Sequence, residues 1–269
     1  MGSMFVNVRL QLYQNCIIPS LLYNLEGWNK LTKGEIKKLE RIQAKALCKI
    51  LDLPRTTPYI GLLNETGLWR IEERLIYRKI MLYHNIINSS EKRMCKKIIC
   101  EQEQSNDPDT FYQTVENMCK ALGIDIQTVK KEIKSKVKSL LKEKINIKMK
   151  NIVQVAGTNM KKLRFIKEAS NSKQKPYILE LDGYEALKTI KLKLNMTPIY
   201  GNFKGDVTKP QRCPYCNDED DTTEHLLTCS VFQPNGFTIE NLENDDNPEL
   251  WRQLNEMVSF NLKNRCYVE

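Results

Sequence analysis

The stretch CPYCNDEDDTTEHLLTC, from Cys213 to Cys229, gathers three of the nine cysteines and one of the two histidines of the chain. Cys213 and Cys216 are separated by two residues, so a tight turn can point both sulfur atoms at one place. His225 and Cys229 are four residues apart, which puts them on the same face of a helix. Asp221 and Glu224 have the spacing of a capping box that would start this helix. The stretch is therefore predicted to fold as a turn followed by a short helix, with four side chains converging.

Three thiolates and one imidazole fill all four positions of a tetrahedral zinc ion, which is the pattern of a closed structural site. Other cysteines stand at irregular spacings, as expected of reduced and mostly buried thiols: Cys16, Cys48, Cys95, Cys100 and Cys119. In a reducing compartment a tight Cys/His group indicates a metal rather than a disulfide. We predict a structural Zn²⁺ bound by what we term the Cys/His cluster: Cys213, Cys216, His225 and Cys229. The alternative is a chance grouping of reduced thiols.

Apolar residues over most of the chain recur with the helical period, and few segments alternate with period two, so the fold is predicted to be mainly α. The clearest helix begins at a Thr32 and Glu35 capping box and ends before Pro54. Its apolar face is predicted to contain Ile36, Leu39, Gln43 or Ile42, Ala46, Leu47 and Ile50. Residues 5–25 are expected to form one helix bent or split at Pro19, and residues 68–88 another. The segment 56–68 between them is interpreted as a loop because of its Pro and Gly residues.

Four consecutive domains are predicted. A helical bundle covers 5–104, a basic helical connector 105–209, a zinc knuckle 210–232, and an acidic stretch with a C-terminal helix 233–269. Helices of the connector are expected over 109–124, closed by Gly123, over 129–150 and over 182–196. The helix over 129–150 would place on one side Ile133, Val137, Leu140, Leu141 and Ile145. The C-terminal helix would pack back, or meet a partner, through Trp251, Leu254, Val258 and Leu262.

The net charge of +9 conceals a strong asymmetry. Residues 217–249 contain ten acidic and no basic side chains, and residues 250–269 sum to +1, which leaves +18 for residues 1–216. A strongly basic portion next to a short acidic one is typical of a protein that binds a polyanion. Ordinary solubilising charge explains the same asymmetry equally well.

Cationic side chains recur every four residues in two predicted helices. The first basic row consists of Lys37, Arg41, Lys45 and Lys49, and the second of Arg70, Arg74 and Arg78. A step of four residues on a helix is about 6 Å, which suits contact with successive phosphates of a nucleic-acid backbone. Solvated charge is the alternative, with Glu40, Glu72 and Glu73 available as ion-pair partners. The lysines of 130–150 are interpreted as a solvated face, and His84 as a packing residue.

Catalytic motifs are missing. The sequence contains no P-loop, GxGxxG, GxSxG or HExxH, and its acidic runs lack the apolar strands that would hold a two-metal site. The chain is therefore not expected to be an enzyme. No apolar run approaches the ~20 residues of a membrane span, so we expect a soluble, intracellular protein without membrane contact.

Two segments resemble a known family. LYQNCIIPSLLYNLEGWNKLTKGEIKKLERIQAKALCKILDLP resembles the helical thumb that follows the polymerase core of non-LTR retrotransposon reverse transcriptases. IKLKLNMTPIYGNFKGD, with the Cys/His cluster after it, is similar to the C-terminal region and zinc knuckle of the same proteins. The resemblance implies that the cluster binds zinc, that the first basic row lies near the template-primer duplex, and that the protein is nuclear. The family's polymerase core, with its aromatic-x-Asp-Asp turn, would precede residue 5, and no endonuclease follows Cys229. The chain would be the C-terminal part of such an enzyme, a truncated element, or a host protein derived from one.

The favoured function is a nucleic-acid-binding module that grips RNA or an RNA/DNA duplex through phosphates, without a polymerase core of its own. The alternative is a zinc-stabilised protein-interaction scaffold. In that case the acidic flank, which runs from Asp218 to Glu249 and starts with Asp218, Glu219, Asp220 and Asp221, would dock onto a basic protein partner. A decayed element with no present role is the third possibility.

Overall fold

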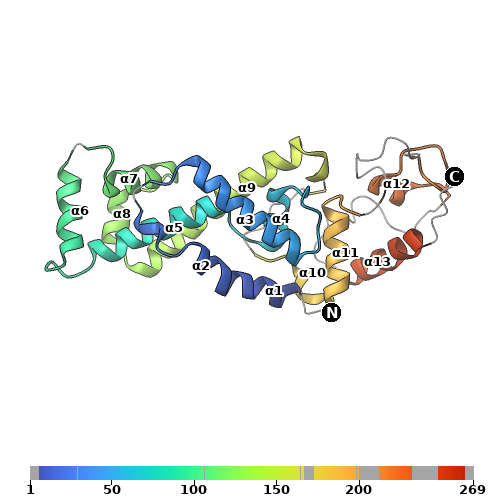
Figure 1. The fold of residues 1–269 in the computed structure, drawn as a ribbon, viewed down its shortest axis with the longest axis horizontal. Coiled ribbons are helices and arrows are strands. Elements are labelled where there is room, and N and C mark those ends of the chain that lie inside the picture. The colour runs from blue at the N-terminus through green and yellow to red at the C-terminus, as the bar shows by residue number, and fades with distance from the viewer. Residues whose placement is uncertain are drawn as a thin grey trace. The chain divides into compact units, whose positions relative to one another are not determined.

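The computed structural model describes residues 6–28, 30–105, 107–163, 165–166, 173–197, 199, 212–231 and 248–263. Within these ranges all regular structure is helical, and the only β-type pairing is a single antiparallel bridge between Arg212 and Asp220. Figure 1 shows this succession of helices. The predicted mainly α fold is confirmed. Among the described helices, none combines the length and the hydrophobicity that crossing a bilayer requires.

Two compact units are distinguished by their internal contacts. The first unit draws its described residues from Met1–Gln11, Ala44–Leu68 and Ile152–Glu269, and the second from Leu12–Gln43 and Trp69–Asn151. Each unit combines segments that are far apart in the sequence, whereas the four predicted domains follow one another along it. The boundaries of the four predicted domains therefore stay untested by this division into units. The extended segment before Cys213 lies largely outside the described residues, and residues 232–247 of the acidic stretch lie wholly outside them.

The N-terminal segment forms the predicted helix, with one irregularity. α1 (Val6–Leu12) continues through a π-helical turn (Tyr13–Ile17) into α2 (Ile18–Leu21), and a 3₁₀ turn (Leu25–Gly27) follows. Pro19 lacks a backbone N–H, and its ring crowds the carbonyl of the preceding turn. The wider π turn just before Pro19 accommodates both effects, so the helix changes its winding rather than breaking.

α3 (Lys33–Ile50) begins as predicted. The Thr32 N–H donates to Glu35 Oε2 at 2.7 Å, and the Glu35 N–H donates to Thr32 Oγ1 at 3.2 Å, which completes a capping box. The open alternative within the apolar face is resolved in favour of Gln43, which is fully buried, while Ile42 is 48% exposed. Gln43 can occupy this buried place because its amide donates to the carbonyl of Trp69 at 3.3 Å.

Segment 56–68 corrects the sequence interpretation, because α4 (Tyr59–Thr66) occupies most of the expected loop. Pro58 stands immediately before the first helical residue, where its fixed φ is compatible with a helix start. Gly67 ends the helix with φ +66°, a conformation that glycine adopts readily. Two of the three residues that suggested a loop, Pro58 and Gly67, are therefore the boundaries of a short helix, and the third, Gly61, lies buried inside it.

Five helices belong mainly to the second unit: α5 (Ile71–Ile87), α6 (Met94–Gln104), α7 (Phe111–Ala121), α8 (Ile126–Lys131) and α9 (Lys134–Asn159). α5 contacts α6, α7 and α8, and the rings of Tyr83 and Tyr112 lie 6.1 Å apart in this core. His84 is buried, with Nδ1 2.8 Å from the Val129 carbonyl oxygen. His84 therefore lies packed in the core, as predicted. Gly123, at φ +66°, closes α7 as predicted.

The lysine-rich segment forms two helices rather than the single helix expected over 129–150. Glu132 has an extended backbone between α8 and α9, so Ile133 precedes α9 and is 69% exposed. Leu140 is only partly buried. The buried residues of α9 instead follow a four-residue step from Val137 through Leu141, Ile145 and Met149 to Val153, and then a three-residue step to Ala156.

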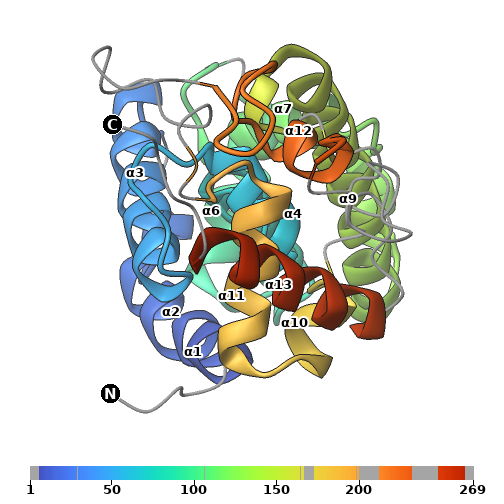
Figure 2. The ribbon, with the colours of Figure 1, turned by 90° about the vertical axis from the view of Figure 1, so that its right-hand side faces the viewer.

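The described C-terminal part of the first unit is built on α10 (Pro176–Glu180), α11 (Gly183–Lys193) and α13 (Pro248–Lys263). α13 packs against α10 and α11, as Figures 1 and 2 show. Trp251 is fully buried with its ring 5.9 Å from that of Tyr177, and the Asn255 amide donates to Thr189 Oγ1 at 2.9 Å. The predicted C-terminal helix therefore packs back onto its own unit, with Leu254 and Val258 also buried. The side chain of Leu262 lies outside the described residues.

Free cysteines occur throughout the described chain. Cys48 and Cys119 are buried, as expected of packing thiols, and Cys100 is half-buried. Cys16 and Cys95 are exposed, so the expectation of mostly buried thiols is wrong for these two.

Candidate metal centre

The first two residues of the Cys/His cluster stand on a tight turn. The Asn217 N–H donates to the Cys213 carbonyl at 2.9 Å, and the Cys213 N–H donates to the Glu219 carbonyl at 2.7 Å. Asn217 has φ +58°, in the left-handed region that Asn tolerates better than most residues. The chain therefore folds back on itself within seven residues, which brings the Cys213 and Cys216 side chains to one side.

The other two residues are placed by a short helix, α12 (Thr223–Thr228). Its N-cap is Thr222, whose Oγ1 accepts from the His225 N–H at 3.1 Å. This corrects the predicted capping pair of Asp221 and Glu224 by one position. The Cys229 N–H donates to the His225 carbonyl at 2.7 Å, so one helical turn separates the imidazole from the last thiol.

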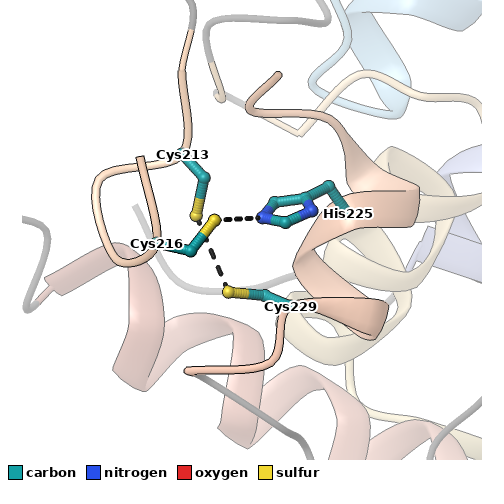
Figure 3. A group of neighbouring side chains, drawn as sticks. All are labelled: Cys213, Cys216, His225 and Cys229. Carbon is teal, nitrogen blue, oxygen red and sulfur yellow. Dashed lines mark hydrogen bonds between the residues drawn. The ribbon is translucent and has the colours of Figure 1, made fainter. Parts of the chain in front are cut away.

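The four ligand atoms converge, as Figure 3 shows, and all lie within 4.8 Å of one another. Cys213 Sγ is 3.8 Å from Cys229 Sγ, and Cys216 Sγ is 3.2 Å from His225 Nε2. A tetrahedral ion with metal–sulfur bonds of about 2.3 Å would hold two sulfur ligands about 3.8 Å apart. The Cys/His cluster could therefore hold one metal ion with little rearrangement.

Burial and local hydrogen bonds make the thiols unequal. Burial raises the pKa of Cys213 to about 11. The backbone N–H groups of Asp218 and Glu219 lower the pKa of Cys216 to about 7, and the Asp218 N–H lies 3.4 Å from its sulfur. Because a thiol binds a metal as the thiolate, Cys216 is the member of this pair that is more readily available at neutral pH.

The histidine is oriented by a carboxylate that the sequence interpretation missed. Glu219 Oε2 lies 2.9 Å from His225 Nδ1, which leaves Nε2 facing the three sulfur atoms. A ligating histidine commonly donates its second N–H to a carboxylate in this way. The acidic run between the two ligand pairs was the sequence signal from which such a carboxylate could have been predicted. Spacing alone does not identify Glu219 among the four neighbouring acidic residues.

The acidic flank is divided by burial. Asp218, Glu219 and Asp220 are exposed, whereas Asp221 is only 1% exposed. A surface that docks a basic partner would therefore contain the first three of these side chains and not Asp221. The rest of the acidic run lies largely outside the described residues.

The first basic row lies along α3, on one continuous helix. All four of its side chains are exposed, and among the described residues none of them has an ion-pair partner: Lys37, Arg41, Lys45 and Lys49. Helix geometry sets their spacing at about 6 Å per step. Within the part of the chain that the structure describes, α3 therefore presents a row of four cations without ion-pair partners to solvent.

The second basic row, on α5, is engaged within the protein. Arg70 Nε lies 2.9 Å from Glu40 Oε1, and its guanidinium also meets Glu72 and Glu73. Arg78 Nη2 lies 2.8 Å from Glu26 Oε1. The predicted alternative of ion pairing is thus found for Arg70. Arg74 is half-buried on the same helix.

In the comparisons with known proteins, no protein-family model, no curated protein and no solved structure matches this chain.

Proposed function

We propose that the chain is a nucleic-acid-binding module that holds the phosphate backbone of RNA or an RNA/DNA duplex on α3 and catalyses no reaction of its own. The observation that carries the proposal is the first basic row, whose four exposed cations stand at regular spacing and have no ion-pair partner among the described residues. Such a row binds phosphates by releasing counterions, without reading the base sequence. The charge of +18 over residues 1–216 supports the same conclusion.

The Cys/His cluster serves this module as a structural zinc site. Three sulfurs and one imidazole nitrogen leave no coordination position for water or substrate, so the ion stabilises the turn and α12. We expect one zinc ion per chain by inductively coupled plasma mass spectrometry. Cys229→Ser should lose it, because the remaining three ligands no longer complete the tetrahedron. Purified protein that stays metal-free in the presence of Zn²⁺ would contradict this role.

The relation to non-LTR retrotransposon reverse transcriptases is part of the proposal. It rests on the thumb-like segment 12–54 and on the Cys/His cluster. If it is correct, a polymerase core on the same or another chain would supply the chemistry, and the protein would act in the nucleus.

Binding of the zinc-loaded chain to an RNA/DNA hybrid, duplex DNA and single strands across a salt series tests the proposal. Arg41→Glu combined with Lys45→Glu should weaken binding at least tenfold and reduce the slope of log K against log salt by about 2. The matched control combines Lys134→Glu with Lys138→Glu, which makes the same charge change at exposed, unpaired lysines of α9.

Unchanged affinity in the α3 variant, or equal losses in the two variants, would contradict a role for α3. In that event the acidic-flank scaffold becomes the better hypothesis. Asp218→Asn with Asp220→Asn is the variant that tests it, since Asp221 is buried and Glu219 contacts His225.

A further inference from the structure

A cavity of about 350 Å³ lies within the second unit, between the end of the N-terminal helical segment and α5. We name it the α2–α5 cavity. Ile18, Pro19 and Leu22 form one apolar wall, and Ile18 and Leu22 are themselves buried. A volume in this range suits one small planar ligand rather than a long peptide.

Two aromatic rings, one from α5 and one from the segment just before it, form another part of the wall. Trp69 and Tyr77 both line the cavity, and their rings meet edge to face with centroids 5.5 Å apart. The indole N–H of Trp69 donates to Asn146 Oδ1 at 2.9 Å, which fixes the orientation of the ring. Fixed aromatic rings beside apolar side chains form a surface on which a nucleobase can stack.

Two guanidinium groups complete the lining. Arg74 and Arg78 stand one turn apart on α5, and no carboxylate is among the residues that line the cavity. Arg78 binds Glu26 through Nη2, at 2.8 Å, and a guanidinium has further N–H donors to offer. The cavity thus combines an apolar and aromatic interior with guanidinium N–H donors, although the charge of Arg78 is partly offset by Glu26, and this lining suits a planar group that carries an anion.

We propose that the α2–α5 cavity binds one unpaired nucleotide, with its base against Trp69 and Tyr77 and its phosphate on Arg74 and Arg78. This inference rests on the proposed nucleic-acid function and deepens it. α3 holds phosphates without regard to strand pairing, whereas the cavity takes a single unstacked base. The protein therefore prefers a duplex that ends in a single-stranded extension over a blunt duplex.

Gln14 gives a way to close the cavity. Its half-buried side chain lines the space, so Gln14→Trp fills it without removing any of the aromatic or arginine groups. Asn15→Trp is the matched control, because Asn15 is exposed and does not line the cavity. Circular dichroism and thermal melting should show both variants folded like the unmodified protein.

The experiment compares full-length, zinc-loaded protein on a blunt RNA/DNA hybrid and on the same hybrid with a four-nucleotide extension that carries 2-aminopurine. The unmodified chain and Asn15→Trp should prefer the extended hybrid by about tenfold and quench the 2-aminopurine fluorescence on stacking. Gln14→Trp should lose both the preference and the quenching while it keeps the affinity and salt slope for the blunt hybrid.

A preference that survives in Gln14→Trp, or that is absent from the unmodified chain, overturns the inference while leaving the function of α3 intact. Loss of blunt-hybrid binding in the unmodified chain overturns the proposed function instead. In that case a titration with adenosine monophosphate tests nucleotide binding in the α2–α5 cavity separately from the function of α3. Saturable nucleotide binding that Gln14→Trp abolishes supports the inference. Binding of an apolar fluorophore in the cavity, without binding of the nucleotide, overturns it.

Discussion

Oε2 of Glu219 lies 2.9 Å from Nδ1 of His225, so the imidazole turns Nε2 toward the three sulfur atoms of the Cys/His cluster. The contact fixes which ring nitrogen can bind a metal ion. It also gives one exposed acid in the run from Asp218 to Asp220 a role that its neighbours do not share. A carboxylate beside the second ring nitrogen is the arrangement that commonly orients a metal-binding histidine and tunes its basicity.

Removing this carboxylate should weaken zinc binding. We expect Glu219→Ala to lower zinc affinity about 10- to 100-fold, because His225 loses the partner that orients it. A competition titration against a chromophoric chelator measures the change. Asp218→Ala removes a neighbouring exposed acid that does not contact His225 and should bind zinc like the unmodified chain. Equal affinities in all three proteins would show that Glu219 has no such role.

Protonation of Glu35 should weaken the start of α3. The Thr32 N–H and hydroxyl donate to its carboxylate and hold the pKa of Glu35 below its usual value. A carboxyl with a lowered pKa in the folded state stabilises the protein above its unfolded pKa, and the effect is lost as pH falls through the folded value. Thermal melts should therefore rank the unmodified chain above Glu35→Gln at pH 7, with the difference shrinking as pH falls into the acid range where Glu35 is protonated in the folded protein. A difference that persists there would mean that the carboxylate charge is not its source.

A buried hydroxyl should contribute measurably to stability. Tyr177 is fully buried and donates its hydroxyl hydrogen bond to Glu65, which is also fully buried. Tyr177→Phe leaves this carboxylate oxygen without the hydroxyl donor and should cost about 1–3 kcal/mol. Melting temperature reports the loss at about 2–4 °C per kcal/mol. Tyr184→Phe, at a tyrosine that is 63% exposed, should melt like the unmodified chain. Similar shifts in the two variants would contradict the assignment.

Substitution of two glycines distinguishes the energetic cost of backbone strain from the cost of a steric clash. Gly67 and Gly123 both have φ +66°, but a Cβ on Gly67 would lie 2.3 Å from the Lys173 carbonyl carbon, whereas a Cβ on Gly123 meets nothing within 4 Å. Gly123→Ala should cost only the conformational penalty of about 1–2 kcal/mol. Gly67→Ala should cost about 1–3 kcal/mol beyond that, because backbone cannot move aside as a flexible side chain does. Urea unfolding midpoints compare the two, and equal losses would mean that the loop at Lys173 shifts freely.

Helix boundaries were predictable where a local capping signal in the sequence sets them. Thr32 and Glu35 are three residues apart, so they cap α3 independently of what the helix packs against. Gly123 ends α7 through its own backbone conformation, which is also a local property. α4 was missed because Pro58 and Gly67 bound a helix as readily as they bound a loop, and only the burial of the residues between them distinguishes the two. The break at Glu132 was missed because the helical period of the lysine-rich segment continues across it.

The same distinction applies to the functional residues. The Cys/His cluster was predictable because its ligands lie within seventeen residues, and the turn and α12 bring them together locally. Glu72 and Glu73 are local partners of Arg70 that the sequence shows. The ion pairs of Arg70 with Glu40 and of Arg78 with Glu26 join residues 30 and 52 positions apart, and no local pattern predicts them. These tertiary contacts complete the difference between the engaged second basic row and the first, which has no ion-pair partner among the described residues.

If the proposed function is correct, the length of the first basic row also sets how many protein molecules one duplex can accept. Lys37 and Lys49 are twelve residues apart on α3, which is about 18 Å along the helix axis. At a rise of about 3.4 Å per nucleotide along each strand, that length covers roughly five base pairs. A long duplex would then offer many overlapping sites, and the number of chains bound would grow with duplex length instead of saturating at one.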